Sequence, residues 1–258
     1  MRLAGVILTY NEAANVVDCV ETLRFTDRIV VFDSFSNDRT VEFAQTAGAD
    51  VIQHHFEDYA SQRNAALDAM RGAADWVLFV DADERVPKAL AEEARMSVDY
   101  PGYAGFRIPR DNYIFGRLTR GAGWYPDYQT RLLRVGAARF DPTRQVHEVT
   151  ILDGKEGTLK NAFIHYNYRD IQQFVAKQRR YTAYDAQIRL EQGIRPKPQN
   201  YVLQPLRQFW WRFVTLKGYV DGLHGLRLSL LMAWNEFRKY TVLRQLWRAH
   251  DYEAGKRT

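Results

Sequence analysis

Two aspartates spaced one residue apart, Asp81 and Asp83, follow directly on the apolar run 76–80 and precede Glu84. Such a run is typical of a buried strand. Side chains alternate along a strand, so Asp81 and Asp83 are expected to point to the same side. Two carboxylates there, completed by water and phosphate oxygens, suit the Mg²⁺ or Mn²⁺ that accompanies nucleotide phosphates. The alternative is a solvated turn, with Glu84 near the start of the next helix.

Two earlier apolar runs, residues 3–8 and 28–32, also end in polar turns that carry acids. Segments with helical spacing lie between these runs, at residues 13–24, 41–48 and 61–71. Strands that alternate with helices predict an α/β fold with a mainly parallel sheet and helices on both faces. In such folds ligands gather at the carboxyl ends of the strands, so we expect the three turns to form one site.

Four short motifs occur in order along the first 168 residues. They are Thr9-Tyr10-Asn11-Glu12, Asp33-x-x-Ser36-x-Asp38-x-Thr40, Arg63-Asn64-Ala65-Ala66-Leu67 and Asp81-x-Asp83. In order and spacing, this series resembles the successive motifs of the family 2 inverting glycosyltransferases. The resemblance implies a GT-A fold and a nucleotide-diphosphate sugar donor, with a UDP-sugar as the first expectation. It also implies a divalent cation, Mg²⁺ or Mn²⁺.

The resemblance also implies roles for individual residues. The nucleotide-binding residues would be Thr9, Tyr10, Asn11, Glu12, Asp33, Ser34, Arg63 and Asp81. Arg63 would approach the diphosphate, because a guanidinium group matches phosphate geometry. Its alternative is a surface ion pair with Asp58 or Glu57. The family commonly has two acids where this chain has Asp33 and Ser34. The contact that this position makes with the nucleotide base is therefore expected to differ from the usual one.

The metal ligands that the resemblance implies are Asp83, Asp81 and, as a later third ligand, His165. The alternative for His165 is an ordinary hydrogen-bonded residue at the end of an apolar run.

An inverting transfer needs a carboxylate that takes the proton of the acceptor hydroxyl. In family 2 this base lies in an acidic motif shortly after a turn like 140–143, and His147-Glu148 occupies that place here. Glu148 is therefore the predicted catalytic base, and Asp127 in the loop 121–127 is the second candidate. The alternative for Glu148 is a salt bridge with Arg131 or Arg144.

The composition predicts a chain of two parts. Its 258 residues are 46% hydrophobic, enough for a sizeable core. We expect a GT-A catalytic domain over residues 1–168 and an α-helical extension over 169–258. The first part holds 19 Lys and Arg against 24 Asp and Glu, and the second holds 17 against 7.

Several features predict a cytoplasmic protein. Cys19 is the single cysteine and excludes an internal disulfide. The chain enters a strand within a few residues, which leaves no room for a signal peptide. No apolar run reaches the roughly 20 residues that a membrane span needs.

The extension combines basic and aromatic residues. One helix is expected from Ile171 to near Gly193, then a break at 194–198, then helices that carry Trp210, Trp211 and Trp234. Basic helices with Trp and Phe are typical of interfacial membrane binding, so we expect peripheral attachment to the anionic inner face of the cell membrane. The alternatives are packing on the catalytic domain and a homo-oligomer. No motif of a nucleic-acid-binding module occurs.

Within the extension, Gly218-Tyr219-Val220-Asp221-Gly222 and Tyr240 resemble the subgroup that includes bacterial lipopolysaccharide core glycosyltransferases. That resemblance implies an envelope-glycan or lipid-linked acceptor.

Two other function classes compete with glycosyl transfer. A sugar-phosphate nucleotidyltransferase is also α/β and metal-dependent, but it is expected to carry a Gly-rich basic loop after its first strand, which residues 9–12 lack. A non-catalytic, membrane-associated scaffold is the other class. The intact acids Asp81, Asp83 and Glu148 argue against it.

Overall fold

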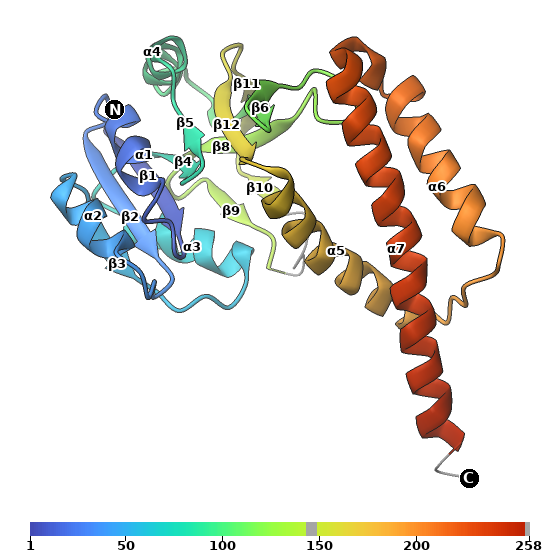
Figure 1. Ribbon diagram of the computed structural model, residues 1–258. Helices are drawn as coiled ribbons and strands as arrows, with labels where there is room; N and C mark the ends of the chain where they lie inside the picture. The colour runs from blue at the N-terminus through green and yellow to red at the C-terminus, as the bar shows by residue number, and fades with distance from the viewer. Residues whose placement is uncertain (143–148, 256–258) are drawn as a thin grey trace. The chain divides into compact units, whose positions relative to one another are not determined.

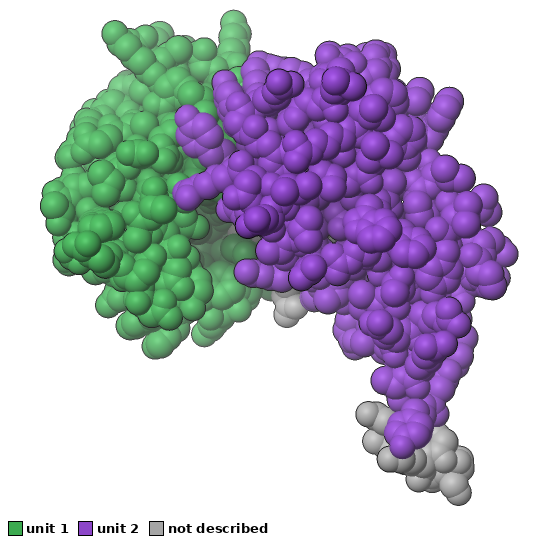
Figure 2. All heavy atoms as spheres, in the orientation of Figure 1, with its two compact units in different colours: residues 1–111, 127–165 green, residues 112–126, 166–258 purple. Residues whose placement is uncertain are grey.

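The computed structural model describes residues 1–142 and 149–255, with side chains to residue 252. These residues form two compact units, which are coloured separately in Figure 2. Unit 1 comprises residues 1–111 and 127–165, and unit 2 comprises residues 112–126 and 166–258. Each unit is described by itself.

Unit 1 is built on a mixed sheet in the order β3-β2-β1-β4-β8-β6-β12-β5 (Figure 1). Its first four strands pair in parallel. They are β1 (Leu3–Thr9), β2 (Arg28–Asp33), β3 (Asp50–Gln53) and β4 (Trp76–Asp81). The pairings β4–β8, β6–β8 and β5–β12 are antiparallel. These strands are β5 (Glu84–Arg85), β6 (Tyr103–Ile114), β8 (Tyr128–Arg134) and β12 (Phe163–Tyr168).

Four shorter strands complete the description. Two of them pair with β6, namely β7 (Arg117–Leu118) and β11 (Lys155–Thr158). The other two, β9 (Ala138–Phe140) and β10 (Thr150–Leu152), form a separate two-stranded sheet.

Helices cover both faces of the parallel strands, as the sequence predicts. They are α1 (Val16–Thr22), α2 (Thr40–Thr46), α3 (Tyr59–Ala69) and α4 (Lys88–Ser97). Alternate residues of each strand enter different cores: Trp76 and Leu78 pack with α1 and α4, whereas Val77 and Phe79 pack with α3. A strand buried on both faces is a continuous apolar run, and this is why β1, β2 and β4 are recognisable in the sequence.

In the antiparallel half of the sheet, residues 129–134 are recognisable in the sequence as a short strand and form most of β8, whereas β6 is not recognisable. β6 has twelve residues and a register shift between Phe106 and Arg107. The apolar alternation that includes Phe106 and Ile108 is lost at Arg110 and Asn112, so β6 lacks a sustained period-two pattern. Helix α4 was also missed by the sequence analysis.

Unit 2 contains three long helices, which are α5 (Ile171–Glu191), α6 (Asn200–Trp210) and α7 (Gly222–Gly255). The helix expected from Ile171 to near Gly193 and the break after it are confirmed. Two short elements join α6 to α7: a π-helix, η1 (Trp211–Thr215), and a 3₁₀-helix, η2 (Gly218–Asp221). Helix α7 packs against both α5 and α6 (Figure 1).

Helix α3 gives the first testable prediction, because it carries Arg63. Asp58 caps this helix, with its Oδ1 accepting a hydrogen bond from the Ser61 amide at 2.8 Å. Asp58→Ala should lower the free energy of unfolding by about 1 kcal/mol, and Asp58→Asn, which keeps an accepting oxygen, by less. Urea unfolding measures this, with exposed Glu57→Ala as the control. Equal losses in all three variants would contradict the cap.

Candidate active site

The carboxyl ends of β1 and β2 are joined by the buried carboxylate of Asp33. Its Oδ1 accepts hydrogen bonds from the Thr9 hydroxyl at 2.9 Å and from the Ser36 hydroxyl. Its Oδ2 accepts from the Ser36 amide at 2.9 Å and from the Gln53 side chain at 3.3 Å. Asp33 therefore organises the turn after β2, and Thr9 and Asp33 are brought together as the resemblance implies.

The residues after Thr9 lie along the same edge. Asn11 has a left-handed backbone (φ 58°), and its side-chain oxygen accepts from the Asn37 amide at 2.9 Å. Glu12 accepts from Asn15 at 2.6 Å, and the hydroxyl of Ser34 accepts from Gln62 at 3.0 Å. Tyr10 is exposed. The turns after β1 and β2 are thus tied to each other, with Tyr10 free of the core.

At the end of β4, both oxygens of Asp81 meet arginines. Arg63 approaches Oδ1 at 3.2 Å and Arg131 approaches Oδ2 at 2.6 Å. Both guanidinium groups are almost fully buried, and Arg63 also lies over the Phe79 ring. Burial alone would raise the pKa of Asp81, but the charges of Arg131 and Arg63 outweigh it and hold that pKa well below its ordinary value. Asp81 is therefore an anion held between two cations.

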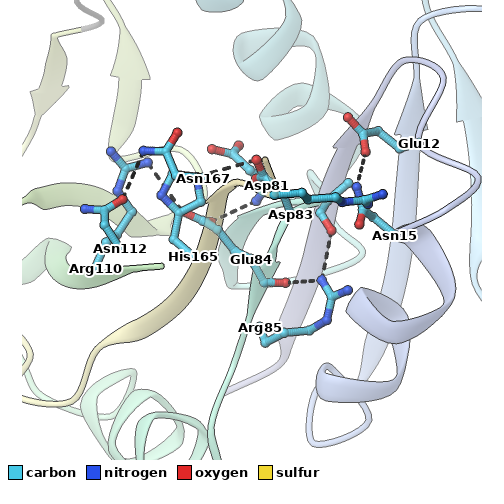
Figure 3. A network of polar contacts seen from close by, with 12 residues as sticks. Glu12, Asn15, Asp81, Asp83, Glu84, Arg85, Arg110, Asn112, His165 and Asn167 are labelled. Carbon is cyan, nitrogen blue, oxygen red and sulfur yellow. Dashed lines mark hydrogen bonds and ion pairs between the residues drawn. The ribbon is translucent and has the colours of Figure 1, made fainter. Parts of the chain in front are cut away.

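Asp83, two residues after Asp81, lies beside His165 (Figure 3). Strand β12 pairs with β5, with His165 opposite Glu84, and this places the His165 Nε2 atom 3.5 Å from the Asp83 Oδ2 atom. The histidine is buried, whereas the Asp83 side chain is 30% exposed. Two residues 82 positions apart in the sequence thus form one pair that faces outward.

Glu84 and Asp127 share a third arginine, Arg110. Arg110 donates to the Asp127 Oδ2 atom at 2.9 Å and lies 3.5 Å from the Glu84 Oε1 atom. Burial and the charge of Asp81 raise the pKa of Glu84, whose Oε2 accepts from the Asp81 amide at 2.9 Å. The other oxygen of Asp127 accepts from Gln129 at 3.1 Å. Both oxygens of Asp127 are therefore already engaged.

The structure brings together most of the predicted site. Asp81, Asp83, Arg63 and His165 lie at the carboxyl edge with Thr9 and Asp33. The predicted base Glu148 lies in residues 143–148, outside the described residues. Arg63 is buried and meets Asp81, whereas Asp58 caps α3.

Sequence reasoning missed two arginines that pair with acids of the candidate site. Arg131 was considered only as a partner of Glu148, and Arg110 was not considered. Arg131 is 5% exposed and is followed in β8 by the buried Leu132 and Leu133. A cation directly before two leucines of a short strand was the available signal, since a buried cation requires an anion.

The pair Asp83–His165 fits a divalent cation. Within residues 1–142 and 149–252, no group of three or more His, Cys, Asp or Glu is arranged to hold a metal ion. One carboxylate and one imidazole nevertheless suit Mn²⁺ or Mg²⁺ when phosphate oxygens and water supply the other ligands.

In unit 2, the loop before β8 contains Trp124 and Tyr125. Trp124 packs against the cluster of Ile114, Tyr168, Phe174 and Leu228. Tyr125 is 40% exposed and lies under the Arg120 guanidinium at 4.8 Å. Trp124 therefore anchors the loop, and Tyr125 is the ring that remains accessible.

Comparison with known proteins identifies the family. The sequence model described as "Glycosyl transferase family 2" matches residues 6–142, more than half of the chain. The chain belongs to glycosyl transferase family 2. That match covers the four motifs, and the strands and helices of unit 1 agree with the GT-A fold that the resemblance implies.

Individual relatives are similar along nearly the whole chain. The "lipopolysaccharide core biosynthesis glycosyltransferase LpsC" of Rhizobium meliloti (strain 1021) is 27% identical over 264 residues, 94% of each chain. An uncharacterized glycosyltransferase of Rickettsia conorii is 28% identical over 95% of this chain and 90% of its own. Among solved structures, glucosyl-3-phosphoglycerate synthase from Mycobacterium tuberculosis with Mn²⁺ and UDP is 21% identical over 43% of this chain and 44% of that one, with a TM-score of 0.36.

The ion cluster around Asp81 gives a stability prediction for this family 2 glycosyltransferase. Asp81→Asn removes the negative charge that both buried guanidinium groups meet, and breaking a buried pair in this way should cost about 3 kcal/mol of unfolding free energy. Asp83→Asn is the matched control and should cost less than about 1 kcal/mol, because Asp83 is half-exposed and meets a single histidine. Urea unfolding of both variants measures the difference. Equal losses would mean that Asp81 does not hold the arginines.

Proposed function

We propose that this family 2 glycosyltransferase moves a sugar, with inversion, from a nucleotide-diphosphate donor to a hydroxyl of an envelope or lipid-linked glycan. A UDP-sugar is the donor we would test first. The observation that carries the proposal is the outward-facing Asp83–His165 pair beside the Asp81 cluster, at the strand edge where α/β folds bind ligands. Asp83 also belongs to the Asp81-x-Asp83 motif, which lies within the residues that the family model matches.

The donor nucleotide is assigned to the turns after β1 and β2. Thr9, Tyr10, Asn11 and Glu12 would lie along the base and ribose, with Asp33 and Ser34 at the base. The hydrogen bonds that join the two turns support this assignment, because they fix the edge on which a planar base would lie. The exposed Tyr10 ring is available to such a base.

The metal is assigned to Asp83 and His165, which would hold Mg²⁺ or Mn²⁺ together with the donor's phosphates. When bound, such a cation stabilises the negative charge that develops on the departing diphosphate. Asp81 is assigned to the nucleotide side and keeps Arg63 and Arg131 in place near the phosphates. Its further role as a metal ligand stays a prediction.

Glu148 is the proposed catalytic base. It would take the proton of the acceptor hydroxyl while that oxygen bonds to the anomeric carbon and the bond to the diphosphate breaks. Asp127 remains the second candidate. The contacts of Asp127 favour Glu148, because both oxygens of Asp127 already accept hydrogen bonds from Arg110 and Gln129.

The acceptor class rests on the relatives and on the extension. The name of the Rhizobium meliloti relative assigns that protein to lipopolysaccharide core biosynthesis, and the similarity covers 94% of this chain, so it includes most of the extension. In the described part of the chain, no helix has the length and apolar character needed to cross a membrane. We propose peripheral attachment at the inner face of the cell membrane, with residues 1–168 as the catalytic domain and 169–258 as the attaching extension.

The metal assignment predicts the behaviour of Asp83→Ala. Mn²⁺ should tighten UDP binding to the unaltered protein, and the variant should lose that tightening because a hard cation loses a carboxylate ligand. Calorimetry with UDP, GDP and ADP, each with and without Mn²⁺, measures it. Glu92→Ala, which removes an exposed carboxylate of α4, is the control. Mn²⁺-dependent binding that persists in Asp83→Ala would remove this residue from the metal site.

The base assignment predicts a different pattern for Glu148→Gln. This change keeps the shape but removes the proton acceptor, so transfer should fall by at least about 10²-fold while donor binding persists. The assay follows labelled sugar from the best-binding donor to an envelope glycolipid fraction. Asp127→Asn is measured in parallel. Near-normal transfer by Glu148→Gln, with a large loss in Asp127→Asn, would assign the base to Asp127.

A further inference from the structure

Unit 2 exposes an apolar stripe on α6 and η1. Val202, Leu206, Trp210 and Val214 are spaced four residues apart, and Leu203 and Trp211 lie beside them. We call these six residues the aromatic face. Trp210 is 63% exposed and Trp211 45%, and α6 has no buried residue. Burying one face is what usually stabilises a helix, so a helix this exposed is expected to bury its face elsewhere.

The charge around the aromatic face has one sign. Residues 192–220 contain no Asp or Glu and five Lys or Arg, of which Arg207 is exposed between Leu203 and Trp211. The next acid, Asp221, is turned to the backbone and accepts from the Gly121 amide at 2.8 Å. Of these five cations, Arg195 pairs with Asp251 of α7 and Arg212 is largely buried, which leaves Lys197, Arg207 and Lys217. A segment that joins exposed apolar side chains with such an excess of cations matches the headgroups and acyl boundary of an anionic bilayer.

The residue types agree with lipid better than with a second protein. Trp prefers the boundary between headgroups and hydrocarbon, where its ring is buried and its N–H stays hydrated. A partner protein would have to supply an acid for Arg207, because residues 192–220 contain no Asp or Glu. The headgroups of an anionic bilayer supply that negative charge without a specific partner residue.

The segment that bears the aromatic face also holds the loop before β8. Arg212 donates to the Ala122 carbonyl at 2.6 Å, and the Ala122 amide donates to the Leu216 carbonyl at 2.8 Å. Arg120 and Gly121 donate their amides to Asp221. Whatever binds the aromatic face therefore lies close to the loop that carries Tyr125.

We propose that the aromatic face docks on an anionic bilayer and so brings the loop 120–126 to the lipid surface. Trp210 and Trp211 enter the interface, and Arg207 meets the lipid headgroups. This arrangement would present a lipid-linked acceptor to the loop. The statement about the acceptor rests on the proposed function, whereas the docking itself does not. Vesicle binding needs no catalysis, so its failure and the failure of the transfer assay are separate results.

Co-sedimentation with vesicles tests the docking. The full chain should pellet with vesicles of phosphatidylcholine and phosphatidylglycerol at low salt, and much less with phosphatidylcholine alone. Binding should weaken as salt rises, because charges are screened over about 8 Å at physiological ionic strength. Trp210→Ala combined with Trp211→Ala should raise the lipid concentration for half-binding roughly tenfold or more. Arg207→Glu should weaken binding to the anionic vesicles and leave the weak binding to phosphatidylcholine unchanged.

The matched control is Tyr181→Ala combined with Tyr184→Ala, which removes two exposed rings of α5 in the same unit. It should bind like the unaltered chain. Brominated lipids should quench tryptophan fluorescence in the unaltered chain more than in the Trp210→Phe, Trp211→Phe variant. Circular dichroism checks that each variant is folded.

Three results would overturn the proposal. The chain could stay in the supernatant with anionic vesicles at low salt, or the double Trp variant could pellet like the unaltered chain. The third result has two parts. Sedimentation equilibrium without lipid would show a dimer that the double Trp variant lacks, and the unaltered chain would not bind vesicles. That third result would assign the aromatic face to a second copy of this chain.

Discussion

The carboxylate of Asp81 between two buried guanidinium groups is the interaction on which the rest of the site depends. Burying any one of these three charges alone is costly, so each requires the other two. Arg63 comes from α3 and Arg131 from β8, which lie 18 and 50 positions from Asp81 in the sequence. The requirement for charge balance therefore fixes the position of a helix and the register of an antiparallel strand against the end of β4.

This charge balance also decides which acid faces outward. Asp81 meets Arg63 and Arg131, while Glu84 and Asp127 meet Arg110. Asp83 has no arginine within the ion pairs seen around it and meets His165, a group that is neutral when it acts as a ligand. Of the four acids around the edge, Asp83 is thus the one that meets no arginine among the described ion pairs. Under the proposed function, the two acids of the motif have different tasks: Asp81 holds the edge together, and Asp83 binds the cation.

The sequence predicted the part of the fold that local patterns describe. β1, β2 and β4 are apolar because both of their faces are buried, and the motifs at their ends follow from that placement. β6 was missed, since its apolar alternation is lost at Arg110 and Asn112. The pair Asp83–His165 was predicted only through the resemblance, because it depends on the pairing of β5 with β12, which joins distant residues. Arg110 and Arg131 were missed for the same reason: their partners are set by strand pairing and not by spacing.

Close backbone packing in unit 2 explains why the aromatic face and the loop before β8 belong to one piece. A Cβ atom at Gly121 would lie 2.3 Å from the Lys217 carbonyl oxygen, and one at Gly225 would lie 1.8 Å from that of Gly218. Only glycine permits these approaches, so the loop, η2 and the start of α7 touch through their backbones. Backbone contacts of this kind leave little freedom for one segment to move without the others. The aromatic face on α6 and η1 and the loop before β8 are therefore expected to move together, because no hinge separates them.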